Sequence, residues 1–98
     1  MPSIKVKQEY PERPAKDCYQ ACLKALKEAG YKIFKQRDIG WFVIATRSVD
    51  ANEVTCNALA GGGAPAFIEL NLSAAKLPEG QLQNQAQELL NLMGKSLG

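Results

Sequence analysis

Histidine is absent from this chain of 98 residues, and cysteine, tryptophan and net charge are all scarce. Without histidine there is no histidine-based catalytic triad, no histidine metal site and no histidine switch near neutral pH. Three cysteines are an odd number, which excludes a complete set of intramolecular disulfides. We therefore expect thiols that are reduced or simply buried.

Long apolar runs are also missing. No run approaches the roughly 20 residues that a membrane-spanning helix needs. The start, Met1-Pro2-Ser3, leads into a predicted strand without a signal-peptide pattern. We expect a cytoplasmic protein, or a periplasmic one if a signal segment has been removed. The length fits a single domain over residues 1–98 with one core.

Charge is unevenly distributed along the chain, although the net charge is only +2. Residues 1–47 hold ten Lys/Arg and five Asp/Glu, a net of +5, whereas residues 48–98 hold two and five, a net of −3. Such segregation predicts one basic and one acidic surface after folding. Lysines that simply line solvent-facing positions explain the same pattern.

The most apolar stretch covers residues 31–48 and holds the only tryptophan and two of the three phenylalanines. It predicts a hairpin that turns at residues 37–40. Both faces of the return strand, residues 41–46, are apolar. Such a strand is either covered on both sides or leaves an exposed apolar patch for a partner.

The remaining elements follow from periodicity. Alternation predicts strands over residues 3–10, 52–59 and 66–72, and helical spacing predicts helices over 15–29 and 81–97, the first ended by a left-handed Gly30. The order is strand, helix, four strands, helix. Short turns favour an antiparallel meander, and two amphipathic helices would cover one face. We predict an α+β two-layer sandwich with a mainly antiparallel five-stranded sheet, in which the first strand takes an edge.

One stretch resembles a known group of domains. An amphipathic helix ending in Ala29-Gly30-Tyr31 precedes a hairpin whose turn carries Asp38-Ile39-Gly40 before an apolar strand. Over residues 15–48 this is similar to small bacterial domains of helix-grip or TATA-binding-protein-like architecture, including the BamC type of envelope lipoproteins. The resemblance implies a scaffold or interaction module and transfers no functional residue. A lipidated cysteine near the start, which an envelope lipoprotein needs, is missing.

Three groups of residues are candidates for reactive or ligand-binding sites. Cys18 and Cys22 lie one helical turn apart and Cys56 can approach them from the sheet, but inward positions and the missing fourth ligand favour core packing. The run Gly61-Gly62-Gly63 leads into proline and a strand rather than into a helix, so it predicts a hairpin loop and not a phosphate loop.

Carboxylates, the third group, give no stronger signal. Asp38 and Asp50 fall in predicted turns, where aspartate bonds the local backbone. Glu53 and Glu69 could be cross-strand neighbours, a pair that would raise one pKa, but solvated carboxylates are the simpler interpretation. We expect no enzyme, no cofactor and no metal.

Two candidate surfaces remain. The sheet face away from the helices is expected to carry an apolar binding face, made of Phe34, Phe42, Ile44, Phe67 and Trp41. A basic surface is expected from the cations of the first half of the chain, which are Lys5, Lys7, Lys32, Lys35, Arg37 and Arg47.

We predict a small non-enzymatic module that binds a partner protein or a second copy through the apolar face. Single-stranded nucleic acid on the basic surface is the alternative. A cup for a small apolar ligand between the second helix and the sheet is a further alternative.

Overall fold

A computed structural model describes residues 3–37, 40–49, 51–62 and 65–97. Its elements follow the predicted order of a strand, a helix, four strands and a helix. Their bounds are β1 (Ser3–Tyr10), α1 (Ala15–Glu28), β2 (Lys32–Arg37), β3 (Phe42–Val49), β4 (Asn52–Gly61), β5 (Ala66–Ser73) and α2 (Glu79–Leu97). Strands β3 and β4 continue beyond their predicted ends, and α2 begins earlier than predicted.

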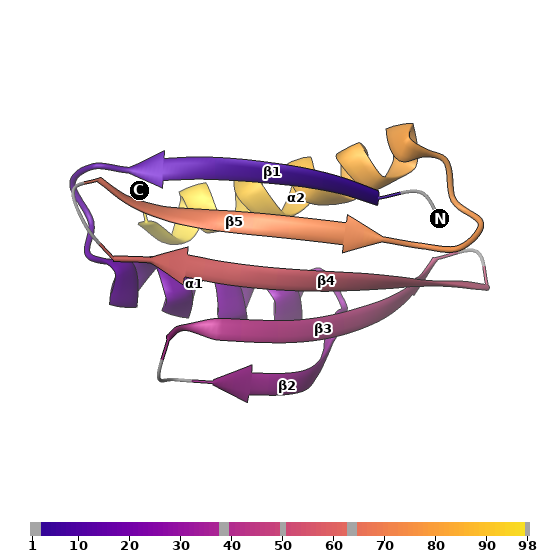
Figure 1. Cartoon of the computed structure of the whole chain (residues 1–98), viewed down its shortest axis with the longest axis horizontal. Coiled ribbons are helices and arrows are strands. Elements are labelled where there is room, and N and C mark those ends of the chain that lie inside the picture. The colour runs from indigo at the N-terminus through magenta and orange to yellow at the C-terminus, as the bar shows by residue number, and fades with distance from the viewer. Residues whose placement is uncertain (1–2, 38–39, 50, 63–64, 98) are drawn as a thin grey trace.

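The five strands form one antiparallel sheet in the order β1-β5-β4-β3-β2 (Figure 1). Consecutive strands β2 to β5 are neighbours because short turns connect them. Strand β1 pairs with β5 along its whole length, so the first strand takes an edge, as predicted. The predicted α+β fold class is therefore confirmed.

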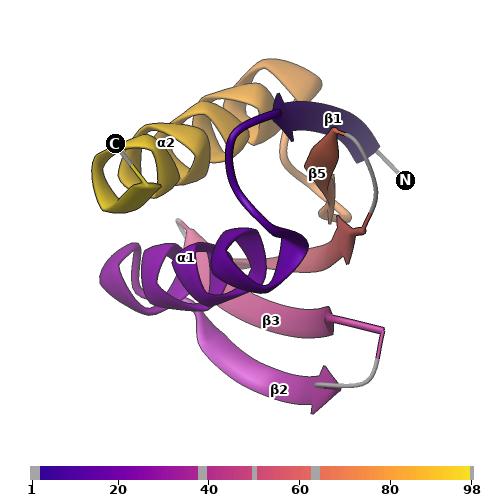
Figure 2. The same cartoon turned by 90° about the vertical axis from the view of Figure 1, so that its left-hand side faces the viewer.

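Both helices lie on the same side of a curved sheet (Figure 2). Helix α1 begins after Pro14, and Gly30 follows it with φ of +89°. That conformation lets the Tyr31 amide donate to the Leu26 carbonyl at 2.8 Å, which closes the helix end as predicted. The buried stripe of α1 is rich in alanine and cysteine, and small side chains allow the helix to pack closely on the sheet.

The core fills the layer between the helices and the sheet. Alternate residues of β3, β4 and β5 point into it and are at most 3% exposed: Val43, Ala45, Val54, Cys56, Ala58, Ala60, Ala66, Ile68, Leu70 and Leu72. From α2, the side chains of Leu82, Leu89 and Met93 meet them with no more than 1% exposure. Because successive strand residues alternate between faces, the intervening side chains must point away from the helices.

Some predicted turns coincide with residues outside the described part of the chain. These are Asp38 and Ile39 in the first hairpin, Asp50 in the next, and Gly63 with Ala64 in the glycine-rich segment. Gly61, which was predicted to lie in the hairpin loop, is instead the last residue of β4. Among the described residues, neither helix combines the length and the apolar character needed to cross a membrane.

Candidate binding face

The sheet face away from the helices, here called the outer face, carries an apolar patch. Phe42 on β3 lies opposite Leu59 on β4, and Ile44 comes two residues after Phe42 on the same face. Phe67 on β5 lies opposite Gly61 at the same end of the sheet. Leu59 is 40% exposed and the other three side chains are half-buried. The apolar patch is therefore defined as Phe42, Ile44, Leu59 and Phe67.

Phe67 is held in place from both sides. Its ring covers Gly61 so closely that a Cβ atom added there would lie 2.1 Å from the ring edge. The Lys7 ammonium nitrogen lies 4.3 Å from the ring centre, within the range of a cation–π contact. Because glycine has no Cβ atom, position 61 leaves room for the Phe67 ring to pack against the backbone of β4.

Phe34, predicted for the binding face, lies at an irregularity that the sequence pattern did not predict. The pairing of β2 with β3 shifts between Ile33 and Lys35, so Phe34 lies in a β-bulge. The bulge moves Lys35 onto the outer face opposite Ile44, which reverses the predicted alternation beyond this point. Phe34 itself is 77% exposed, the most exposed large apolar side chain described.

Trp41 does not belong to the outer face, which corrects the predicted binding face. It has φ of +48° at the end of the hairpin turn, and its ring packs against the core. A Cβ atom on Gly62 would lie 3.5 Å from Trp41 Cζ3 and 3.9 Å from the Ala15 side chain, so the ring lies beside the start of α1. The left-handed backbone directs this residue toward the helix layer, while Phe42 points away from it.

Five of the six cations predicted for a basic surface share the outer face. Lys32, Lys35 and Arg37 form a row along β2, and none of the three has an ion pair with another described residue. On the opposite edge, Lys5 forms a salt bridge with Glu69, with 3.3 Å between the charged atoms, and Lys7 contacts Phe67. The β2 side of the face is therefore the more strongly cationic side.

Arg47 is the exception, and its predicted place on the basic surface was wrong. It points to the helix side, where its Nη1 donates to Gln85 Oε1 at 3.0 Å and to Glu88 Oε1 at 3.3 Å. The Tyr31 hydroxyl donates to the same Gln85 oxygen at 3.3 Å, and burial raises the pKa of Tyr31. Arg47 thus joins β3 to α2 and is a structural residue.

Replacing Arg47 with methionine, which keeps the stem and removes the charge, is expected to lower the free energy of unfolding by about 1–3 kcal/mol, because partly buried acceptors on α2 lose their donor. Urea denaturation measures the change. The same substitution at Lys35 is the control and should change stability by less than about 0.5 kcal/mol. Equal effects at the two positions would contradict the assignment.

The remaining candidates for reactive groups are the three cysteines and the pair Glu53 and Glu69. Cys18, Cys22 and Cys56 are at most 1% exposed, as the core-packing interpretation predicted. Among the described residues there is no group of three or more potential metal ligands. Glu69 lies opposite Leu59, whereas Glu53 comes six residues before Leu59 on β4. The two carboxylates are therefore separated by about 20 Å along the strands and are not cross-strand neighbours.

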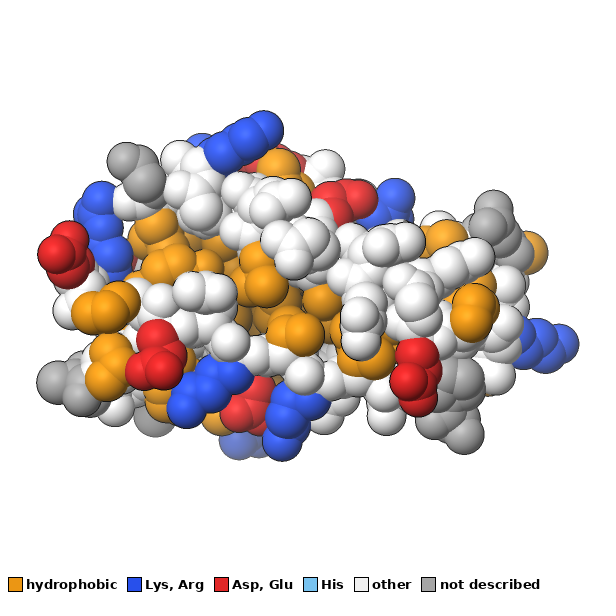
Figure 3. All heavy atoms as spheres, turned by 90° about the horizontal axis from the view of Figure 1, so that it is seen from above, with side chains coloured by type: hydrophobic (Ala, Val, Ile, Leu, Met, Phe, Trp, Pro, Cys, Tyr) orange, Lys and Arg blue, Asp and Glu red, His pale blue; other side chains and the backbone are white. Residues whose placement is uncertain are grey.

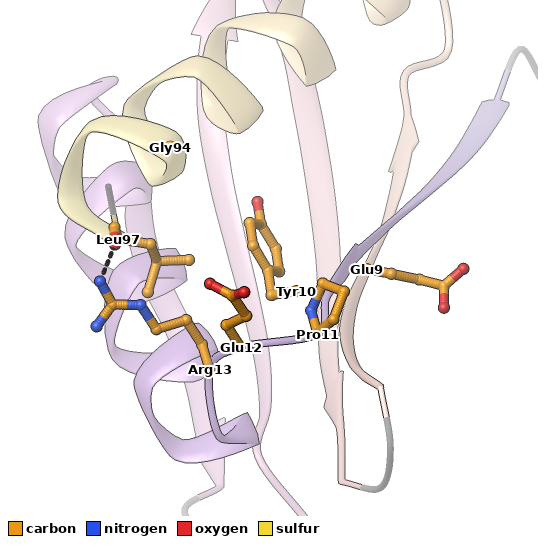
Figure 4. A pocket seen from close by; sticks show the side chains of 7 residues that line it. All are labelled: Glu9, Tyr10, Pro11, Glu12, Arg13, Gly94 and Leu97. Carbon is orange, nitrogen blue, oxygen red and sulfur yellow. Dashed lines mark hydrogen bonds between the residues drawn. The ribbon is translucent and has the colours of Figure 1, made fainter.

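A hollow of about 490 Å³ lies where the end of β1 and the segment before α1 meet the last turn of α2. Tyr10, Glu12 and Arg13 border it on one side and Leu97 on the other, and Arg13 Nη2 donates to the Leu97 carbonyl (Figure 4). It opens at the molecular surface and has a mixed polar and apolar lining. It is therefore not the deep apolar cavity expected of a ligand cup.

The fold and the exposed sheet face define a small α+β domain of helix-grip type. No family model and no curated protein matches the sequence. Among solved structures, the chain is similar to Ara h 8.0201, with a TM-score of 0.72 and 11% identity over 98% of this chain and 97% of that one. It is also similar to TTHA0849 from Thermus thermophilus, with a TM-score of 0.57 and 13% identity over 98% and 91%. At these identities the similarity establishes the fold alone.

Proposed function

We propose that this protein is a small non-enzymatic module that binds a partner protein through its outer face. The observation that carries the proposal is the apolar patch, where Phe42, Ile44 and Leu59 lie together on the sheet face opposite the two described helices. Partly exposed aromatic and aliphatic side chains of this kind supply the core of protein interfaces. The candidate catalytic residues are distant from one another or buried, which supports a binding role over a catalytic one.

The cations along β2 suggest what this partner looks like. Lys32, Lys35 and Arg37 border the patch without an ion pair to a described residue, so a partner with apolar side chains flanked by carboxylates would complement both features. Stacking of two outer faces is less favourable. Whichever way two copies were turned, the cations of β2 would face lysines of the second copy, on β1 or on β2.

The test is an NMR titration with an acidic peptide of alternating leucine and glutamate. We expect amide shifts on β3 and β4, and binding that weakens about tenfold in Ile44→Ser because an apolar anchor is lost. Lys35→Glu should also weaken binding, whereas Lys16→Glu makes the same charge change on the exposed side of α1 and serves as the matched control. Shifts confined to the helices, or equal losses in both charge variants, would overturn the proposal.

Single-stranded nucleic acid is a second candidate, favoured by one observation. Five cations share a face with Phe42, and Phe34 protrudes beside three of them. Exposed rings stack on bases while cations contact phosphates, and such binding weakens steeply with salt. A titration with oligothymidylate at low and at moderate salt tests this candidate. Oligothymidylate has bases that can stack on the exposed rings, whereas the acidic peptide has charge but no bases, so the two titrations discriminate the candidates. Absence of binding at low salt would remove this candidate.

Narrower assignments remain predictions. A specific relation to BamC-type envelope domains, a bacterial origin and a cytoplasmic location are compatible with a small α+β domain but rest on the sequence patterns alone. The apolar-ligand cup also remains a prediction. Side chains fill the layer between the helices and the sheet, and for that reason we favour binding at the outer face.

A further inference from the structure

The β1 edge of the sheet is open along its whole length. Eight residues of β1 pair with β5 in one continuous register without a bulge. Along its other side, β1 has no neighbouring strand among the described residues. The Gln8 side-chain amide donates to the Glu9 carbonyl at 3.2 Å, and this exposed contact would have to move aside for a strand that pairs there. No other strand of the described chain pairs with this side of β1, and an unpaired edge of this length is a template for one.

The opposite edge is different. Strand β2 is shorter, with six residues, and the bulge at Phe34 interrupts its pairing. A bulge is a device that prevents an edge from accepting a further strand. Of the two edges, only β1 has the regular geometry that strand addition requires.

An apolar groove runs beside the β1 edge. Figure 3 looks down onto the side of the molecule where β1 and α2 lie, and hydrophobic side chains line the hollow between them. Ile4, Val6 and Tyr10 on the helix side of β1 are only partly buried, and so is Leu90 on α2. The exposed Gln8 lies on the same side between Val6 and Tyr10 and is the polar residue of this row. The hollow at Tyr10 and Leu97 lies at one end of this groove. Whatever strand pairs with β1 would also cover apolar side chains.

We propose that the strand that pairs with this edge is β1 of a second copy, antiparallel to the first and related by a two-fold axis at Lys7. In this register Ile4 lies beside Tyr10 of the second copy, and Lys5 lies beside Glu9 of the second copy, each twice by symmetry. Antiparallel neighbours face the same side, so the apolar pairs extend the groove and the charged pairs lie on the outer face. The result is one continuous ten-stranded sheet.

The charge pattern of β1 selects this register. A shift by one residue would place apolar side chains against charged ones on the wrong face. A shift by two in one direction sets Lys5 against Lys7 of the second copy, and a shift by two in the other direction pairs only residues 6–10. At the axis itself the two Lys7 side chains meet, but each ammonium group is directed toward Phe67 on β5, which draws the charges away from each other.

Charge exchange tests the proposal by analytical ultracentrifugation from micromolar to millimolar concentration. The unmodified protein is expected to dimerise. Lys5→Glu and Glu9→Lys should each weaken the dimer about tenfold or more, because each sets like charges opposite each other twice. The double variant should restore it. An equimolar mixture of the two single variants should form heterodimers, since the carboxylates of one then face the ammonium groups of the other.

Because Lys5 also forms a salt bridge with Glu69 of its own subunit, all variants are made with Glu69→Gln, which removes the carboxylate that would face Glu at position 5. Three results would overturn the proposal: a monomer of the unmodified protein at millimolar concentration, a dimer that neither single variant weakens, or a double variant that stays as weak as the singles. Circular dichroism shows whether each variant is folded. Lys35→Glu on the outer face of β2 is the matched control and should leave dimerisation unchanged; if it dissociates the dimer instead, the contact lies on the β2 side of the sheet. The outcome is independent of the acidic-peptide titration, because β1 pairing leaves the apolar patch uncovered.

Discussion

Replacing Leu70 with alanine is expected to lower the free energy of unfolding by about 2–5 kcal/mol. Leu70 lies at the centre of β5 on the helix side and is fully buried. Its truncation removes apolar contacts and leaves a cavity that neighbours in the closely packed core cannot fill completely. Urea denaturation followed by circular dichroism measures the change from the shift of the midpoint at constant slope.

The control is the same substitution on the neighbouring strand but on the other face. Leu59 is 40% exposed on the outer face of β4, so Leu59→Ala should change stability by no more than about 1 kcal/mol. The comparison holds the chemistry of the substitution constant and varies only the face. Losses of equal size would mean that both sheet faces are covered, and the candidate binding face would then not exist.

Alkaline pH is expected to destabilise the protein through its buried thiols. Burial raises the pKa of Cys56 from the usual value of about 9 to about 12, and burial together with the nearby Cys56 thiol raises the pKa of Cys22. The folded state thus keeps both thiols protonated at a pH where the unfolded state releases the protons. Their contribution to stability is complete below about pH 9 and is lost as the pH rises from there toward 12.

Linkage sets the slope of this loss. Each thiol contributes up to about 1.4 kcal/mol per pH unit within the window, so the pair approaches about 3 kcal/mol per unit. Unfolding is measured in urea with a reductant present, from about pH 8 to about pH 11. The double variant Cys22→Ala/Cys56→Ala removes the two thiols and keeps all other alkaline effects, so its pH dependence should be shallower. Identical slopes would show that these thiols are not buried in the protonated form.

Much of the fold could be predicted because the hydrophobic periods are regular. The alternation of β5 and the small-residue stripe of α1 each indicated the element and the face that it buries. The prediction that β1 takes an edge followed from its polar alternate residues, and the pairing with β5 confirms it. These features depend on residues that are close in sequence.

The candidate site was less predictable because its departures come from single-residue irregularities and distant contacts. One extra residue at Phe34 reverses the alternation of β2, and nothing in the local pattern indicates it. The left-handed backbone of Trp41 directs an aromatic ring toward the helix layer. Arg47 resembled a surface cation because its partners, Gln85 and Glu88, are 38 and 41 residues away. Leu59 alternates with Ala58 along the predicted strand and could therefore have been assigned to the outer face, yet it was not included in the predicted binding face.

The bulge in β2 has a consequence for how far an assembly can grow. A subunit that accepted strands at both sheet edges would build an open-ended filament, the arrangement that leads to fibres. Here one edge is regular and the other is interrupted by the bulge at Phe34. Once two β1 edges have met, each end of the enlarged sheet is a β2 strand that resists further addition, so polymerisation terminates after a single association step.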